Sequence, residues 1–166
     1  MKTVSFRNDV LPLKDKLFRL ALRITLNRED AEDIVQDTLV KVWRELQRDT
    51  TIDNLEAFSL TVCRRLCLDL KNKKETQNIP FDQQIHDRPD VSPLPSERLE
   101  KDERLTQLHQ LIDSLPEKQR TAVQLRDIEE RSYKEIADIM QISESDVKVN
   151  IFRARKKIKE SLSNAK

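Results

Sequence analysis

The sequence predicts an all-α protein in which two small helical domains are joined by a proline-rich linker. Apolar residues recur at spacings of three and four along most of the chain, as on the buried face of a helix. No segment shows the sustained alternation of a half-buried strand. Between about residues 75 and 97 the helical pattern disappears, and prolines there would break any helix. The predicted division is a first domain over residues 1–76, a flexible linker over 77–98 and a second domain over 99–166.

The first domain contains three predicted helices. The first is marked by Leu13, Leu17, Leu20 and Ile24. The second runs from about Glu29 to Leu46 with Asn27 as its cap, and its inward-facing residues are Ala31, Ile34, Val35, Thr38, Val42 and Leu46. A polar connection over 47–54 leads to a third helix, marked by Phe58, Val62, Leu66 and Leu70. It ends among the lysines at 71–74, where cations complement the helix dipole.

The second domain contains four predicted helical segments. The first is marked by Leu105, Leu108, Ile112 and Leu115. Pro116 suits the first turn of the next segment, which continues through Ala122, Leu125 and Ile128. Ser132 is expected to cap a short helix, and a turn over 141–143 leads to the last helix.

The composition of the chain excludes several classes of function. The chain has 166 residues and no Gly, so phosphate-binding P-loops, dinucleotide-binding turns and EF-hand loops are absent. Cys63 and Cys67 cannot form a secreted disulfide framework and are expected to be small apolar residues of a helix. No apolar run approaches the roughly 20 residues of a membrane span. We expect a cytoplasmic protein with no cofactor and no metal.

Charge is unevenly distributed, although the net charge is only +1. Acidic residues gather at 29–37, whereas basic residues gather at 64–74 and near the end of the chain. A charged partner responds to such local patches rather than to the net charge. Two basic faces and one acidic face therefore predict at least two kinds of partner.

The last two predicted helices form a helix-turn-helix pattern, in which the second helix enters a DNA major groove. Their predicted inner contacts are Ile136, Ala137, Met140, Ile142, Val147 and Ile151. The opposite side of the last helix carries Lys148, Val149, Phe152, Arg155 and Lys159. A solvated basic face on an ordinary helical hairpin is the alternative. A helix of nearly one charge sign repels itself without a polyanion, which favours DNA binding.

Several stretches resemble a known family. Residues 30–43 (DAEDIVQDTLVKVW) and 54–69 (NLEAFSLTVCRRLCLD) are similar to region two of the bacterial extracytoplasmic-function sigma factors, which belong to the sigma-70 family. Residues 115–120 (LPEKQR), 132–137 (SYKEIA) and 147–157 are similar to region four. The resemblance implies an RNA polymerase sigma factor, which directs core polymerase to specific promoters and assists transcription initiation.

The resemblance also implies a polymerase-binding face. In the family, the acidic helix docks on the clamp-helices coiled coil of the largest polymerase subunit, and the matching residues are Asp33, Gln36 and Asp37. Residues at i, i+3 and i+4 share one helical face and can accept hydrogen bonds from Arg or Lys of a partner helix. Without the resemblance, a solvated acidic face would be the simpler interpretation.

Two sets of promoter contacts follow from the same resemblance. For the minus-ten element, which region two melts, the expected contacts are Arg48, Asn54, Thr61, Arg64 and Arg65. For the minus-thirty-five element they are Lys148, Asn150, Phe152, Arg153, Arg155 and Lys156. Phe58 and Trp43 are expected to pack in the core rather than to touch DNA.

Other functions remain open at this point. A free-standing helix-turn-helix transcriptional regulator would show the same last two helices. An enzyme has little support, because His86 and His109 lack the Glu three residues earlier that di-metal helical bundles use. The sequence leaves open whether an anti-sigma factor is a further partner, and it leaves the relative placement of the two domains undetermined.

Overall fold

The computed structural model describes residues 5–48, 52–76 and 99–164, and in the last range side chains are described from residue 103. These residues form helices and turns and include no strand, which confirms the predicted all-α class. The α-helices are α1 (Lys14–Thr25), α2 (Arg28–Gln47), α3 (Leu55–Thr76), α5 (Leu99–Asp113), α6 (Glu117–Val123), α7 (Tyr133–Met140) and α8 (Glu144–Asn164). The predicted linker over 77–98 lies outside the described residues. None of the described helices is long and apolar enough to cross a membrane.

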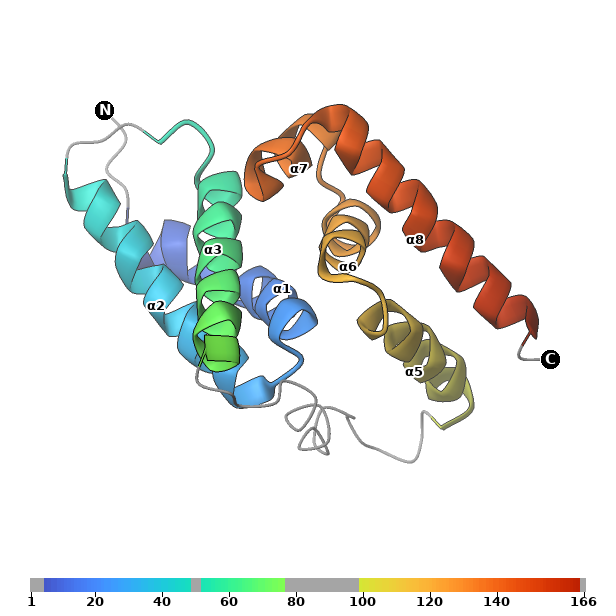
Figure 1. Cartoon of the computed structure of the whole chain (residues 1–166). Coiled ribbons are helices and arrows are strands. Elements are labelled where there is room, and N and C mark those ends of the chain that lie inside the picture. Colours follow the sequence, from blue (N-terminus) through green and yellow to red (C-terminus); the bar gives the residue numbers. More distant parts are fainter. Residues whose placement is uncertain (1–4, 49–51, 77–98, 165–166) are drawn as a thin grey trace.

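Helices α1, α2 and α3 pack against one another and form the N-terminal lobe (Figure 1). On α2, the predicted inward-facing residues are buried, except that Leu46 is half-buried. Asn27 caps α2 as predicted, because its Oδ1 accepts a hydrogen bond from the backbone N–H of Asp30 at 2.9 Å. Cys63 and Cys67 are buried in this core, as expected for small apolar residues.

Helices α5 to α8 form the C-terminal lobe, in which the predicted helix-turn-helix is present as α7 and α8. Ser132 and Glu135 form a capping box at the start of α7: Ser132 Oγ accepts from the backbone N–H of Glu135 at 3.1 Å, and Glu135 Oε1 accepts from that of Ser132 at 3.4 Å. Gln141 ends α7 with a left-handed φ of 58°. Gly is the residue that usually takes this conformation, and the chain has none. Gln141 therefore makes the turn, although a residue with a Cβ has a higher energy in this conformation.

The segment after α6 differs from the continuous helix that the sequence predicts. Gln124–Ile128 forms a π-helical turn, in which the backbone N–H of Glu129 donates to the carbonyl of Gln124 at 3.0 Å. The Nε2 of Gln124 also donates to Oε2 of Glu129 at 3.0 Å. Both side chains are buried, so the wider turn brings a paired carboxylate into the protein interior.

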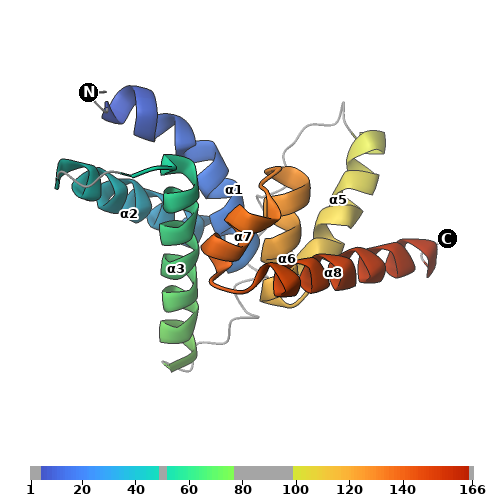
Figure 2. The ribbon, with the colours of Figure 1, turned by 90° about the horizontal axis from the view of Figure 1, so that it is seen from above.

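The two lobes pack directly on each other, an arrangement that the sequence did not indicate. Helix α3 lies against α7, and α1 lies against α6 and the π-helical turn. Figures 1 and 2 show α6 and α7 between the N-terminal lobe and α8. One continuous apolar cluster includes buried residues of both lobes, for example Leu60 of α3 and Met140 of α7. A second, smaller cluster holds α5, α6 and α8 together.

Candidate protein and nucleic-acid interfaces

The acidic face of α2 consists of Asp33, Gln36 and Asp37, and the structure places all three in solvent on one side of the helix. Val40 continues this face at i+3 from Asp37 and is 48% exposed. Sequence reasoning missed Val40, although its position among exposed polar residues was a usable signal. The face therefore combines carboxylates with one exposed apolar side chain.

Not every acid of this stretch is available to a partner. Asp30 forms an ion pair with Lys74 at the end of α3, and Glu32 pairs with Arg28 at 3.2 Å. The ion pair of Asp30 joins α2 to α3 and so helps to hold the N-terminal lobe together. Asp33 and Asp37 are both exposed, so they are the carboxylates of this face that a partner can reach.

The residues predicted to contact the minus-ten element lie in two places. Asn54, Thr61 and Arg65 follow one face of α3 at spacings of seven and four. The Thr61 hydroxyl donates to the carbonyl of Ala57 at 2.8 Å. The Oδ1 of Asn54 accepts from the backbone N–H of Ala57 at 3.0 Å and so caps α3. Arg48 lies at the far end of α2, and residues 49–51 of the intervening loop lie outside the described residues.

Arg64 is set apart from that face by its burial, with a side chain that is only 9% exposed. Its Nη1 donates to the backbone carbonyl of Met140 at 3.1 Å. Its Nη2 donates to Glu117 Oε1 at 3.0 Å. Both partners belong to the C-terminal lobe, so in this arrangement Arg64 is covered by protein rather than presented to solvent.

The two aromatic side chains that were expected to pack do so. Trp43 meets Phe6 edge to face, with ring centroids 5.5 Å apart, and both pack against the main core. Phe58 is half-buried on the same core. Base stacking by these rings is therefore not needed to explain their positions.

The outer face of α8 presents most of the predicted minus-thirty-five residues. Phe152 is 66% exposed, and Lys148, Arg153 and Lys156 are also exposed. An apolar ring in solvent on a basic helix suits contact with thymine methyl groups, while the cations suit phosphates and base edges. Asn150 is half-buried, and its Nδ2 donates to the carbonyl of Asp146 at 2.8 Å.

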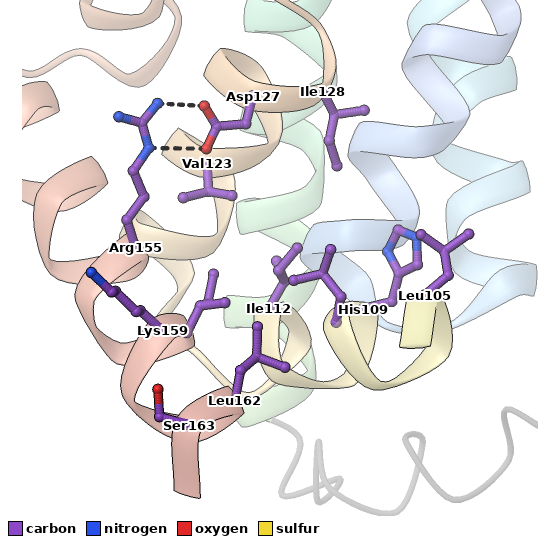
Figure 3. Close-up of a pocket in the computed structure, with 12 residues that line it drawn as sticks. Leu105, His109, Ile112, Val123, Asp127, Ile128, Arg155, Lys159, Leu162 and Ser163 are labelled. Atoms are coloured by element: carbon purple, nitrogen blue, oxygen red, sulfur yellow. Dashed lines mark hydrogen bonds and ion pairs between the residues drawn. The ribbon is translucent and has the colours of Figure 1, made fainter. Parts of the chain in front are cut away.

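Arg155 is the exception on α8, because its guanidinium is already occupied. Its Nη2 and Nε donate to the two carboxylate oxygens of Asp127 at 2.5 and 3.1 Å (Figure 3). The hydrogen bonds that Arg155 donates to the Asp127 carboxylate raise the pKa of Arg155 further above its usual value, against the opposing effect of burial. The pair ties α8 to the π-helical turn.

An apolar groove of about 740 Å³ lies between α5 and α8. Leu105, Ile128 and Leu162 line it and are 51%, 39% and 39% exposed. Figure 3 shows these side chains around the groove, with the Arg155–Asp127 pair at one end. Leu105 and Ile128 belong to the apolar spacing expected of a buried helix face, yet that face is only partly covered at these two residues.

Comparisons with known proteins agree with this arrangement. The chain matches the family models "Sigma-70 region 2" over residues 10–76 and "Sigma-70, region 4" over residues 105–158. It is 33% identical to the ECF RNA polymerase sigma factor SigE of Mycolicibacterium smegmatis over 89% of this chain, and it spans 58% of that relative's length. It is 30% identical to the ferric citrate uptake sigma factor FecI of Escherichia coli, with 75% of this chain and 72% of FecI covered.

The fold also resembles a solved structure of the sigma factor RpoE in complex with the anti-sigma factor NepR from Bartonella quintana. The TM-score is 0.75 at 24% identity, covering 95% of this chain and 96% of RpoE. The chain therefore belongs to the extracytoplasmic-function sigma factors of the sigma-70 family. The predicted function, an RNA polymerase sigma factor, is confirmed and is supported over a free-standing regulator.

Proposed function

We propose that this sigma factor acts through three separate surfaces: the acidic face of α2 for core polymerase, the face of α3 for the minus-ten element and the outer face of α8 for the minus-thirty-five element. The observation that carries the proposal is the coexistence of exposed carboxylates on α2 with exposed cations on α8. Opposite charges on different helices of one chain suit one protein partner and one nucleic-acid partner.

The polymerase surface consists of Asp33, Gln36, Asp37 and the exposed Val40. Carboxylates on one face accept charge-assisted hydrogen bonds from Arg or Lys of a partner helix. Val40 supplies an apolar contact within the same patch, as interface centres commonly do. Together these features favour a protein partner over simple hydration of the face.

The minus-ten surface comprises Asn54, Thr61 and Arg65 along α3, with Arg48 at the entrance of the preceding loop. Arg65 is exposed and suits a phosphate of the separated strand, while the side chains of Asn54 and Thr61 can donate or accept. Arg64 is also assigned to this surface, and in this structure its guanidinium is bonded to Met140 and Glu117 of the C-terminal lobe.

The minus-thirty-five surface consists of Lys148, Asn150, Phe152, Arg153 and Lys156 of α8. We assign phosphate binding to Lys156 and base contact to Arg153, whose guanidinium can bond a guanine edge through two donors. Arg155 has a positioning role, because its ion pair with Asp127 sets α8 against the π-helical turn.

The proposed role is binding, and it needs no catalytic group from this chain. It takes place in the cytoplasm, where bacterial core polymerase and DNA are found. An anti-sigma factor is a further proposed partner. The support is that the fold resembles RpoE in complex with NepR, and CnrH in complex with the cytosolic domain of CnrY at a TM-score of 0.64.

Transcription from a genomic fragment library tests the proposal and requires no assumed promoter sequence. Core polymerase with the protein should yield RNA 5′ ends at a defined set of sites that core polymerase alone does not use. Upstream sequences of those sites should share two short elements. A protein that binds promoters specifically without core polymerase, and that adds no new start sites with it, would contradict the proposal.

A further inference from the structure

The outer face of α8 carries two exposed apolar side chains next to its cations. Phe152 is 66% exposed and Val149 is 41% exposed. Among the large apolar side chains of the described residues, that of Phe152 is the most exposed. Neither proposed promoter surface includes Val149. Two neighbouring apolar side chains in water favour a partner that covers them.

The buried side of α8 fixes the direction in which these two side chains point. Val147, Ile151 and Ala154 are buried and anchor the helix on the C-terminal lobe. Val149 and Phe152 lie on the opposite side, one turn apart at i and i+3. Figure 1 shows α8 along the outer edge of the C-terminal lobe, with α6 and α7 between it and the N-terminal lobe. The apolar pair is therefore presented to solvent by a fixed helix.

Basic side chains lie on both sides of the apolar pair. At about 100° per residue, the order around the outer side of α8 is Lys148, Phe152, Val149 and Arg153. The Lys148 ammonium lies over the Tyr133 ring, 5.5 Å from its centroid, and so leans toward α7. A helix in a major groove has base edges in front of it and a phosphate backbone on each side. This order directs the cations to the phosphates and the apolar pair to the bases.

The base edges offer one kind of apolar partner. In the major groove, the apolar group that a base pair presents is the C5-methyl group of thymine. The other groups there are donors and acceptors, which an apolar side chain would desolvate without bonding. Side chains at i and i+3 are about 4.5 Å apart along a helix axis, and successive base pairs are about 3.4 Å apart. Two methyl groups on adjacent or next-but-one base pairs match this spacing.

We propose that Val149 and Phe152 form a methyl-recognition site, which selects thymine at two base pairs of the minus-thirty-five element. This inference rests on the proposed contact of α8 with that element. A protein partner is a poorer match, because lysine is depleted at protein interfaces and every charged residue over 147–159 is basic. An A·T and a T·A pair carry the methyl group on opposite strands, so the site also distinguishes their orientation.

Replacing thymine with deoxyuridine tests the site, because it removes the methyl group and retains base pairing. The starting duplex carries the upstream element shared by the start sites of the genomic library. Each thymine of the element is replaced singly, on either strand, and holoenzyme binding is measured by fluorescence anisotropy. Binding should weaken about fourfold at each of two positions, the factor expected when one methyl-sized apolar group is no longer buried. Those positions should lie on adjacent or next-but-one base pairs.

The variants Val149→Ser and Phe152→Ala remove the two apolar side chains separately. Both positions are exposed, so the melting temperature should change little. Each variant should weaken binding to the thymine duplex and abolish the uracil effect at one of the two positions only. Lys156→Ala is the matched control on the same face of α8. It should weaken binding to every duplex and retain both uracil effects, because a phosphate contact does not depend on the methyl group.

The control separates this inference from the proposed function on which it rests. Methyl recognition is overturned if Lys156→Ala weakens binding but no thymine shows a uracil effect, or if the element lacks two A·T pairs at that spacing. A uracil effect that persists in both apolar variants would belong to DNA shape and would also overturn it. Unchanged DNA binding by both apolar variants would overturn it and leave the pair to a protein partner. If all three variants bind DNA as the native chain does, the proposed use of α8 itself is wrong.

Discussion

Arg23 and Gln124 lie 101 positions apart in sequence, yet Nε of Arg23 donates to Oε1 of Gln124 at 2.8 Å. The same guanidinium donates to Asp113 at 2.8 Å, and its Nη2 lies 2.8 Å from Nδ1 of His109. The Arg23 side chain is only 8% exposed. Groups of the C-terminal lobe therefore compensate its charge in place of water. One arginine thus links α1 to both α5 and the π-helical turn.

Replacing Arg23 with Ala should lower the free energy of unfolding by about 2 kcal/mol. Removing one partner of a buried ion pair costs about 3–5 kcal/mol, but separation of the lobes would rehydrate Asp113 and reduce that cost. Urea unfolding followed by circular dichroism measures the change. Arg28→Ala is the control, because its pair with Glu32 lies on the surface with 56% and 54% exposure. A loss no larger than that of the control would contradict the structural role of Arg23.

Gln141→Gly should stabilise the turn between α7 and α8 by about 0.5–1 kcal/mol. A left-handed residue with a Cβ costs about 1–2 kcal/mol, and the variant loses only the exposed bond from Gln141 Nε2 to the Asp138 carbonyl. Leu26, also left-handed at φ 57° but buried, gives the contrast. Leu26→Gly should destabilise, because lost core packing outweighs relief of the backbone. Thermal unfolding of both variants tests the pair, and destabilisation by Gln141→Gly would refute the argument.

Glu135 should make the stability of the C-terminal lobe dependent on pH. Burial opposes its charged form, but hydrogen bonds from Ser132 and the charge of Arg131 outweigh burial and lower the pKa of Glu135 from its usual 4.5. A carboxyl with a lowered folded pKa stabilises the fold above its unfolded pKa, and that stabilisation is lost as the pH falls through the folded pKa. The native chain should therefore exceed Glu135→Gln in stability near neutral pH, and the difference should shrink below about pH 4.5.

Urea midpoints of the two proteins at a series of pH values measure this difference. Glu130→Gln serves as the control at an exposed position of the same lobe. An advantage of the native chain that stays constant into the acid range would show that the carboxylate charge of Glu135 is irrelevant.

Asp33→Arg combined with Asp37→Arg should abolish co-purification with core polymerase. The helical circular dichroism and the melting temperature should change little, because both side chains are exposed. The same change at Asp15 and Asp138, which are exposed elsewhere, controls for the altered net charge. Retention of the Asp33 and Asp37 double variant on core polymerase at moderate salt would exclude this face from the interaction.

Arg153 and Lys156 should differ in the way they support DNA binding. Lys156→Ala should weaken binding to all duplexes and lower the salt slope by about one unit, as loss of a phosphate contact does. Arg153→Ala should cost about 1–3 kcal/mol at the preferred upstream element and relax the choice of one base pair. Anisotropy over a salt series, with holoenzyme and single-base variants of the element, distinguishes them. An equal loss for every variant would assign Arg153 to the backbone and pass base contact to Asn150 or Lys148.

Local patterns predicted the helices and the surfaces well. The caps at Asn27 and Ser132 were predicted because a side-chain oxygen before an apolar-periodic segment satisfies the first free N–H groups of a helix. The packing of Phe58 followed from its place on an apolar stripe, and that of Trp43 from its place at the end of a helix. The π-helical turn at Gln124–Ile128 left no such signal, because its apolar spacing is compatible with an ordinary helix.

By itself, the sequence determined the all-α class, the helix-turn-helix and the acidic and basic faces, because helical period and local charge are properties of neighbouring residues. Tertiary structure alone decided that Arg64 is covered by Glu117 and that Arg155 is held by Asp127. An arginine on a helix has the same local pattern whether it meets DNA, solvent or a distant carboxylate. Its partner is set by how the lobes pack, which depends on the sum of many long-range contacts rather than on any short stretch of chain.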